Sequence, residues 1–372
     1  MLWLILLWPL SRLAPLRRSR WVVGENRGWP TGDNGYWFAR YCRDNRPGQA
    51  IQFIVDRHSP WYRRARMEGL PVLAYGGPRH AWAFLRATVG FYTHLPSDLV
   101  CLRCFDLFGF RGKLVYLHHG VLGFKAFDAL YRRYLGMMDL FIVATPCERD
   151  ILIQRERIPE HRIAHTGYPR YDRFQPTSAG PRRILYLPTH RSTHDGAESD
   201  APLRARIEAL LRSPRLRGLL ESHDADLALL PHPYLKPIAM TSTSSPHIRI
   251  VPPGATERDR LMEQSSLLIT DYSSVAWDFL QRERPVVFYR FDLDAYRRAR
   301  PGYLDLGDET LGPVARDQDT LLNWIEHYLE RDFVTDFTPG EQHRFANLDE
   351  PAAPRIFRMA RNMEGLGDSS RG

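Results

Sequence analysis

The stretch LLITDYSSVAWDF, residues 267–279, changes from a strand pattern to a helix pattern within four polar residues. LLIT is a short apolar run of the kind that forms buried strands. After the polar residues, Val275, Phe279 and Leu280 recur at helical spacing and give the expected helix an inward face. Ser273 or Ser274 is a suitable N-terminal cap, because its hydroxyl can accept a hydrogen bond from an N–H group of the first helical turn. The stretch therefore predicts a strand that leads directly into a helix.

Short apolar runs of this kind recur along the chain, with amphipathic stretches between several of them. The expected strands are residues 21–23, 51–55, 71–75, 90–95, 113–119 and 140–145, followed by 184–188, 227–231, 248–252, 266–270 and 285–290. Strands that alternate with helices favour βαβ units and parallel sheets. We therefore expect an α/β fold with two Rossmann-like, doubly wound domains that face each other across a cleft.

One polar stretch, FQPTSAGPRR at residues 174–183, interrupts this alternation and is the expected linker. The chain then divides into four parts, which are an N-terminal segment (1–20), a first domain (21–173), a second domain (182–345) and a C-terminal helix and tail (346–372). The last helix is expected to cross back to the first domain.

Charge and cysteine content restrict the partners and the compartment. The 372-residue chain has a formal net charge of +8 at pH 7 and an isoelectric point near 9.4, which indicates an anionic partner. No RRM, helix-turn-helix or basic–aromatic repeat is present, so we expect no nucleic acid partner. Four cysteines in a chain of this length do not make a disulfide framework and fit a reducing compartment.

The first 20 residues, MLWLILLWPLSRLAPLRRSR, resemble a membrane-surface segment. Their uninterrupted apolar run is ten residues long, whereas a spanning helix needs about 20. Arginines follow the run instead of preceding it, unlike the pattern of a secretory signal. Trp3 and Trp8 beside these arginines suit a helix that lies in the interface of an anionic leaflet. A frayed terminus without such a role is the alternative.

Polar residues follow several of the expected strands, and ligands of doubly wound sheets bind beyond the carboxyl ends of the strands. Thr270, Ser273 and Ser274 lie where a strand ends and a helix begins, so hydroxyl and N–H groups there can bind an anion. Simple helix capping is the alternative. Asp271 belongs to the same turn, and Asp278 lies in the helix that follows.

A second polar end occurs in YLHHGVLGFK, residues 116–125. Alternation along the strand places His118 and His119 on opposite sides, so only one of them is expected to face the cleft. A histidine in that position can act as a general base near neutral pH. Gly120 lets a substrate approach the backbone closely.

Two more strand ends carry candidates. His232 lies between prolines in LLPHPYLKP (229–237), and Arg191 ends ILYLPTHR (184–191), where its guanidinium could clamp a phosphate. No acid cluster stands near the histidines at metal-ligand spacing, and neither a P-loop nor GxGxxG is present. We expect no metal and no bound cofactor.

Taken in order, these motifs resemble the CDP-glycerol glycerophosphotransferase family, the teichoic acid primases and polymerases. The matching stretches are HHGVLGFK (118–125), TGYPRYD (166–172), LYLPTHR (185–191), LPHP (230–233), LLITDYSSVAWDF (267–279) and PVVFYRFDLDAY (285–296). The family is similar in fold to GT-B glycosyltransferases and requires no metal. The resemblance implies that CDP-glycerol or CDP-ribitol is the donor and that a polyol phosphate is transferred from it.

The resemblance also implies roles for particular residues. The family's HG histidine corresponds to His119, which would deprotonate the acceptor hydroxyl, and its PHP histidine to His232, which would stabilise the pyrophosphate or the leaving CMP. Donor phosphate would be held by Thr270, Ser273, Ser274 and Arg191, with Gly120, Lys125, Asp271 and Asp278 as further cleft candidates. The cytidine is expected near Val251.

In this interpretation the first domain is the acceptor side and the second binds the CDP donor. The acceptor would be an anionic or glycolipid molecule at a membrane, and the enzyme would be peripheral, at the cytoplasmic face of the plasma membrane. Two positions depart from the family pattern. His190 stands where a tryptophan is usual, and Pro301 is inserted between Arg300 and Gly302.

Two alternative functions remain open. One is a GT-B glycosyltransferase that uses a nucleotide sugar in capsule or lipopolysaccharide synthesis, although residues 263–283 lack the Glu-rich motif usual in such donor domains. The other is a non-catalytic basic protein that binds a membrane or a nucleic acid.

Overall fold

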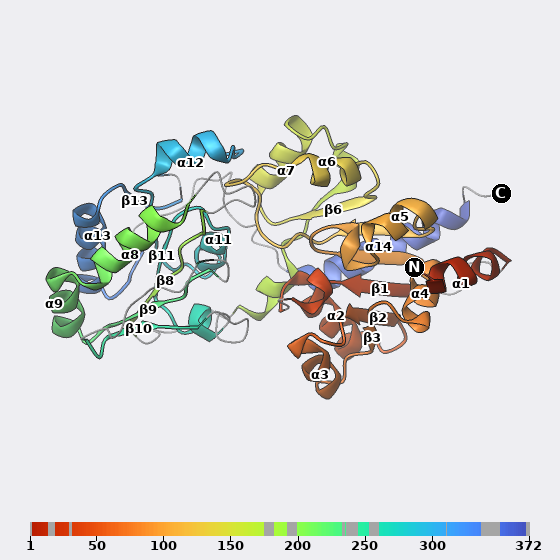
Figure 1. The fold of residues 1–372 in the computed structure, drawn as a ribbon. Coiled ribbons are helices and arrows are strands. Elements are labelled where there is room, and N and C mark those ends of the chain that lie inside the picture. Colours follow the sequence, from red (N-terminus) through yellow and green to blue (C-terminus); the bar gives the residue numbers. More distant parts are fainter. Residues whose placement is uncertain are drawn as a thin grey trace. The chain divides into compact units, whose positions relative to one another are not determined.

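The computed structural model describes residues 2–13, 19–29, 32–174, 182–191, 199–232, 235, 245–252, 260–309, 311–335 and 350–369. Most of the expected linker lies outside the described residues. The chain divides into two compact units, whose elements are labelled in Figure 1. Unit 1 contains Met1–Val121, Phe127–Phe174 and Arg344–Gly372, and unit 2 contains Leu122–Ala126 and Gln175–His343.

Unit 1 is built on a seven-stranded sheet in the order β3-β2-β1-β4-β5-β6-β7, and all of its neighbouring strands are parallel. The strands are β1 (Arg20–Gly24), β2 (Ala50–Val55), β3 (Val72–Ala74), β4 (Val89–Tyr92), β5 (Lys113–Tyr116), β6 (Leu140–Val143) and β7 (Ile163–His165). β4 and β6 are buried along their whole length, as expected for parallel strands that helices cover on both faces.

The helices of unit 1 connect these strands. They are α1 (Leu2–Leu13), α2 (Asn34–Asn45), α3 (Pro60–Met67), α4 (Pro78–Arg86), α5 (Leu102–Phe108), α6 (Ala129–Leu135), α7 (Pro146–Gln154) and α14 (Ala352–Ser369), with the short 3-10 helices η1 (Asn26–Gly28), η2 (Pro96–Asp98), η3 (Glu160–Arg162) and η4 (Pro169–Arg173). Several begin with a matched cap. Thr145 and Glu148 form a capping box at α7, for example, which satisfies N–H groups at the start of that helix.

The C-terminal helix α14 packs against α2 and η4, within unit 1. Asp172 in η4 accepts hydrogen bonds from the backbone N–H groups of Ala352 (2.7 Å) and Ala353 (2.8 Å). A carboxylate at this position satisfies N–H groups that a helix start leaves without partners. Asp172 therefore attaches the last helix of the chain to the first unit.

Unit 2 is built on a six-stranded parallel sheet in the order β10-β9-β8-β11-β12-β13, the doubly wound order. Its strands are β8 (Arg183–Tyr186), β9 (Asp226–Leu229), β10 (Ile248–Ile250), β11 (Leu267–Thr270), β12 (Val286–Tyr289) and β13 (Val314–Ala315). Its helices include α8 (Ala201–Leu211), α9 (Pro214–Ser222), α11 (Val275–Leu280), α12 (Leu293–Ala299) and α13 (Gln318–Glu330). The expected parallel, doubly wound α/β architecture is confirmed within each unit.

One prediction about the division of the chain differs from the structure. The first domain was expected to be continuous over 21–173, but residues 122–126 pack with unit 2. The carbonyl of Gly123 accepts hydrogen bonds from the N–H groups of Tyr303 (2.8 Å) and Leu304 (3.0 Å), and Ala126 N–H donates to the carbonyl of Pro301 (3.0 Å). These backbone bonds attach the segment that follows the HHG motif to the second unit.

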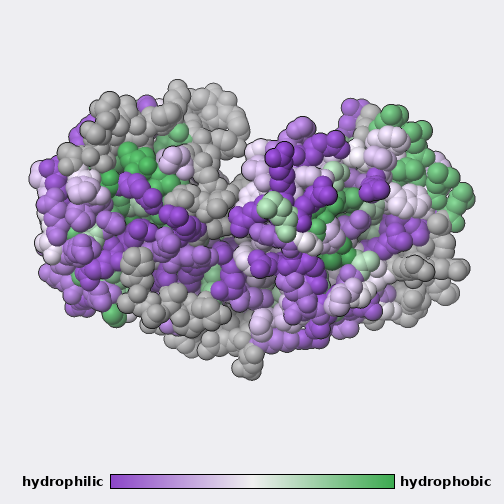
Figure 2. All heavy atoms as spheres, turned by 90° about the horizontal axis from the view of Figure 1, so that it is seen from below, coloured by the Kyte–Doolittle hydropathy of each residue, from purple (hydrophilic) through white to green (hydrophobic). Residues whose placement is uncertain are grey.

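Helix α1 exposes an apolar face. Leu4 and Ser11 are its buried residues, and it packs against α4 and α5. Its exposed apolar side chains are Leu2, Trp3, Ile5, Leu6, Trp8, Leu10 and Leu13. Figure 2 shows hydrophobic surface gathered at the end of unit 1 that carries α1 in Figure 1. Among the described residues, no helix is both long and apolar enough to cross a bilayer.

Candidate active site

The HHG motif lies directly beyond the carboxyl end of β5, which ends at Tyr116. His118 is completely buried, whereas the side chain of His119 is exposed. The two histidines are thus divided between the inside and the surface, but not by strand alternation. The backbone of His118 is in the left-handed region, with φ of 59°. Residues other than glycine adopt this conformation only where the surrounding structure imposes it. The turn therefore directs His119 outward.

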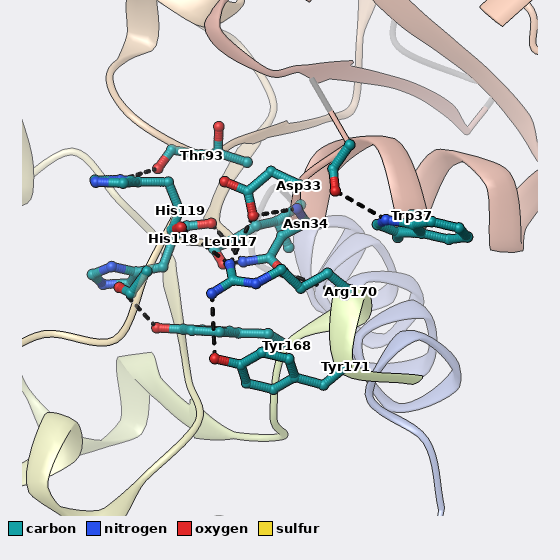
Figure 3. Close-up of polar contacts among 12 residues, drawn as sticks. Asp33, Asn34, Trp37, Thr93, Leu117, His118, His119, Tyr168, Arg170 and Tyr171 are labelled. Atoms are coloured by element: carbon teal, nitrogen blue, oxygen red, sulfur yellow. Dashed lines mark hydrogen bonds and ion pairs between the residues drawn. The ribbon is translucent and has the colours of Figure 1, made fainter. Parts of the chain in front are cut away.

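Two side chains from other parts of unit 1 hold this turn, as Figure 3 shows. Asn34 Nδ2, at the start of α2, donates to the carbonyls of Leu117 (3.0 Å) and His118 (2.7 Å). Arg170 Nη1, from η4, donates to the carbonyl of His119 (3.1 Å). Three consecutive carbonyls are thereby satisfied by side chains, which compensates for the absence of strand pairing at these residues.

Arg170 is itself fixed in position. It is only 6% exposed, and its Nη1 atom also lies 2.7 Å from Oδ1 of Asp33. Asp33 in turn accepts a hydrogen bond from Asn34 N–H at the start of α2. A buried guanidinium requires such pairing, because an unpaired buried charge is costly. Neither Asn34 nor Arg170 was predicted as a site residue, although Arg170 lies within the quoted TGYPRYD motif.

The His119 ring has two neighbours in the loop that follows β4. Its Nδ1 atom lies 3.4 Å from the carbonyl oxygen of Thr93. A carbonyl can only accept, so Nδ1 carries the proton and Nε2 is left with a lone pair. The ring also stacks on His94, with centroids 4.3 Å apart and planes within 9° of each other. Loss of water around the ring, then the neighbouring His94 and His118, lower the pKa of His119.

His118, in contrast, is shielded from solvent. Burial first, and the charge of Arg170 second, lower the pKa of His118 to about 3. It is therefore neutral at any physiological pH and packs among aromatic rings, with Tyr116 at a centroid distance of 4.2 Å. Gly120 is buried next to it, and its carbonyl accepts a hydrogen bond from the hydroxyl of Tyr168 (3.4 Å). Of the two histidines, only His119 can meet a substrate.

In unit 2 the predicted residues also collect at the carboxyl edge of the sheet. His190 and Arg191 follow β8, His232 follows β9, and the DYSS turn follows β11. Since all neighbouring strands run parallel, their carboxyl ends meet at one edge. The structure therefore gathers these candidates, but it gives them different degrees of exposure.

Asp271 and Arg191 form a buried ion pair instead of an open anion site. The Nη1 atom of Arg191 lies 2.9 Å from the carboxylate of Asp271, and its Nε atom lies 2.7 Å from that of Asp292. Asp271 also accepts hydrogen bonds from the N–H groups of Thr189 (3.0 Å) and Tyr272 (2.6 Å). With Arg191 5% and Asp271 2% exposed, the pair stabilises the loop. This geometry gives little support to the predicted role of Arg191 as a phosphate clamp, because its guanidinium is already paired with two carboxylates.

The other residues of the DYSS turn differ in the same way. Thr270 is buried and donates its hydroxyl to the carbonyl of Leu187 (2.7 Å). Ser273 and Ser274 are half-buried. Ser274 occupies the cap position of α11 but makes no capping bond with its side chain, whereas Ser273 Oγ accepts from Val275 N–H at 3.3 Å. The two serines are thus the members of the turn that can reach a ligand.

Helix α11 corrects two details of the prediction. It is only six residues long, so its dipole is a weak source of anion affinity. Its buried residues are Ala276, Trp277, Asp278 and Phe279, not the stripe of Val275, Phe279 and Leu280 that the spacing indicated. Asp278 is 8% exposed, which makes it a poor candidate for direct ligand contact.

His232 forms a pair with His190. Their ring centroids are 4.2 Å apart, and both side chains are partly exposed. Burial first, then the neighbouring His190 and Lys125, lower the pKa of His232 to about 4. A neutral histidine beside an exposed lysine is suited to donate a hydrogen bond to a phosphate.

The two departures from the family pattern meet at this place. The guanidinium of Arg300 donates to the carbonyls of His190 (3.0 Å) and Arg191 (2.7 Å). The carbonyl of the next residue, Pro301, accepts a hydrogen bond from the N–H group of Ala126, which belongs to segment 122–126. Gly302 lies so close to the carbonyl of Phe124 that a Cβ would come within 2.7 Å of it. The two departures thus lie in one local structure next to the histidine pair.

Val251, beside which the cytidine was expected, follows the edge strand β10 and is buried. Its N–H group donates to the carbonyl of Leu229. Within the described ranges, no group of three or more His, Cys, Asp or Glu side chains is arranged to hold a metal ion.

Comparison with protein families matches residues 23–350 to the family described as CDP-Glycerol:Poly(glycerophosphate) glycerophosphotransferase. The match covers both units and all of the motifs quoted above.

The individual relatives that match include proteins of teichoic acid synthesis. The minor teichoic acid biosynthesis protein GgaB of Bacillus subtilis (strain 168) is 23% identical over 364 residues, which cover 92% of this chain and 39% of the relative. The teichoic acid glycerol-phosphate primase of Bacillus spizizenii is 40% identical over 156 residues, or 39% of this chain and 37% of the relative. The matched part of the chain thus spans well under two thirds of the length of these relatives.

Among solved structures, a variant of the wall teichoic acid polymerase TagF aligns with a TM-score of 0.69 at 16% identity. The alignment covers 98% of this chain and 93% of that chain. At this identity the likeness concerns the fold.

Proposed function

Because the chain belongs to the CDP-glycerol:poly(glycerophosphate) glycerophosphotransferase family, we propose that it transfers a polyol phosphate, preferably glycerol phosphate, from a CDP-linked donor to an acceptor hydroxyl. The acceptor in this proposal is a membrane-associated glycan or a teichoic-acid-like chain, and CMP is released. The observation that carries the proposal is His119, an exposed histidine beyond β5 whose proton position is defined by the carbonyl of Thr93.

In the proposed reaction His119 is the general base. The lone pair of its Nε2 atom takes the proton of the acceptor hydroxyl while the acceptor oxygen attacks the phosphorus that carries the polyol. The bond from this phosphorus to the CMP oxygen breaks, and CMP leaves with the electron pair. A base whose pKa lies below the usual value stays unprotonated at neutral pH and is available for this step.

The donor is proposed to bind at the carboxyl edge of the unit 2 sheet. The half-buried hydroxyls of Ser273 and Ser274 and the imidazole of His232 are the groups offered to its phosphates. Binding of a phosphate dianion would raise the pKa of His232 from about 4, because a nearby negative charge favours the protonated ring. Phosphoryl transfer depends mainly on such positioning and charge neutralisation. The proposal includes the predicted cleft, in which the acceptor and the CDP-linked donor would meet.

A donor panel tests the proposed reaction. The protein is incubated with CDP-glycerol, CDP-ribitol and UDP-sugars in the presence of a lipid-linked acceptor, and the released nucleotide is identified by chromatography. We expect CMP from CDP-glycerol, with less from CDP-ribitol. Release of UDP alone would overturn the proposal in favour of a nucleotide-sugar glycosyltransferase, and release of no nucleotide would favour a non-catalytic binding protein.

We also propose that α1 attaches the enzyme to the cytoplasmic face of the plasma membrane. Its exposed apolar side chains, with Arg12 at the end of the helix, have the composition of an interfacial helix. Leu6→Gln with Leu10→Gln should reduce co-sedimentation with vesicles that contain anionic lipid, since both side chains are more than half exposed. Met67→Gln, at an exposed apolar residue of α3, is the matched control. Equal sedimentation of both variants would refute attachment through α1.

A further inference from the structure

His94 is in direct contact with His119, the proposed base. It follows β4 by two residues and stacks on His119 with nearly parallel planes, at a centroid distance of 4.3 Å. Its side chain is 30% exposed. Both rings belong to unit 1, and every residue between β4 and η4 is described. The contact therefore lies within one unit.

A buried carboxylate holds the loop that carries His94. Asp98, in η2, is 2% exposed, and its Oδ2 atom accepts hydrogen bonds from the N–H groups of Thr93 (3.1 Å) and His94 (3.0 Å). The same oxygen lies 3.8 Å from Nδ1 of His94. One carboxylate thus holds the backbone of the loop and favours the protonated form of its histidine.

The same loop controls the base from a second direction. Thr93, whose N–H group is bonded to Asp98, presents the carbonyl that lies 3.4 Å from Nδ1 of His119. Asp98 therefore orders two contacts with the base at once, which are the stacked ring of His94 and the Thr93 carbonyl. Either contact alone would restrain the His119 ring, and together they define both its plane and its proton position.

We infer that His94 is a positioning residue for His119: held by Asp98, it fixes the plane of the His119 ring, and its protonated form places a positive charge beside that ring. The inference rests on the proposed function for its catalytic meaning, but not for the coupling between the two rings. His94 touches no reacting atom in this scheme. The positive charge of protonated His94 disfavours a second proton on His119 and so keeps the base free.

The charged groups around the pair support this assignment. Burial alone would lower the pKa of His94, but the contact with Asp98, and then the charges of Asp33 and Glu25, raise it above the usual value. Facing His119 are His94, His118 and the guanidinium of Arg170. Loss of water around the ring, and then these three groups, lower the pKa of His119. His118 is neutral at neutral pH, so the protonated form of His94 and the guanidinium of Arg170 are the positive charges that face His119.

The coupling can be measured without any substrate. In protein labelled at the histidine side chains, NMR titration follows the His119 imidazole, which is assigned by the signal lost in His119→Gln. His94→Phe retains a flat ring and removes the charge, so we expect the pKa of His119 to rise by about one pH unit. His161→Phe, at an exposed histidine of η3, is the control and should leave His119 unchanged. An unchanged pKa of His119 in His94→Phe would overturn the inference.

Turnover separates the two effects of His94. In His94→Phe the acid limb of the kcat/KM profile should move to higher pH with the pKa of His119, while kcat at alkaline pH stays close to that of the wild type. His94→Gln lacks both ring and charge, so kcat should fall about tenfold at every pH, because the base is less well oriented. If His94→Phe does not fold, the titration is done on His94→Gln, where the pKa of His119 should rise as well. No CMP release from any protein would refute the proposed function while leaving the titration result valid.

Discussion

The carboxyl edges of the two sheets use their polar residues differently. At the edge of the unit 1 sheet one histidine is exposed, and buried side chains such as Asn34 and Arg170 hold its turn. At the edge of the unit 2 sheet the motif residues themselves are divided, since Asp271 and Arg191 are buried in an ion pair and Ser273 and Ser274 remain accessible. A conspicuous motif therefore contains both supporting and contacting residues, and only burial and partners distinguish them.

The largest effect is expected where a supporting residue is removed. Asp271→Ala leaves the guanidinium of Arg191 with one carboxylate partner fewer in a buried place and leaves the N–H group of Thr189 without an acceptor. Loss of one partner of a buried pair costs about 3–5 kcal/mol. We expect the free energy of unfolding, measured by urea denaturation, to fall by that amount. Asp294→Ala, at an exposed aspartate of α12, should change stability by less than about 0.5 kcal/mol. Equal losses of stability in the two variants would contradict the supporting role of Asp271.

The next prediction concerns the buried histidine of unit 1. The pKa of His118 is lowered to about 3 in the folded state, against about 6.5 in the unfolded chain. Between these values the unfolded state binds more protons, so stability falls as pH decreases, by up to about 1.4 kcal/mol per pH unit. Urea unfolding at several pH values should show this slope between pH 6.5 and 3. In His118→Phe the slope should be smaller, and an identical slope would place the effect elsewhere.

A smaller effect is expected at the accessible serines of unit 2. Ser273→Ala with Ser274→Ala removes two hydroxyls from the proposed donor site, so the Kd for CDP-glycerol should rise about tenfold, equivalent to about 1.4 kcal/mol. Stability should change little, since Ser274 makes no capping bond with its side chain. Ser222→Ala, at an exposed serine at the end of α9, is the control. A loss of stability without a change in Kd would return the serines to a capping role.

Much of the fold was predictable because parallel strands have a strong local signal. Each expected apolar run overlaps a strand of the structure, since parallel strands that are buried on both faces are apolar over most of their length. The strands that were missed, β7 and β13, have three and two residues. β7 and β13 contain only two apolar residues each, fewer than any stretch from which a strand was expected, and they form through pairing with a neighbouring strand.

The site was predictable only in part, because its supporting contacts join distant residues. The HHG motif indicated His119, but Asn34 lies more than 80 residues before the carbonyls that it holds. His94 was hidden in the apolar run GFYTHL, which indicated only a strand. The guanidinium of Arg191 suits phosphate binding and a buried ion pair equally well, so its residue type could not decide between the two roles. No sequence pattern signalled that residues 122–126 would pack with unit 2.

The central claim is that the exposed histidine of unit 1 performs the chemistry while unit 2 binds the donor. The most direct test measures CDP-glycerol binding by calorimetry and CMP release by chromatography on His119→Ala, with His161→Ala as the matched control. The account predicts a Kd close to that of the wild type and a loss of CMP release of at least about 100-fold, the usual contribution of a general base. CMP release at the wild-type rate in His119→Ala would contradict it.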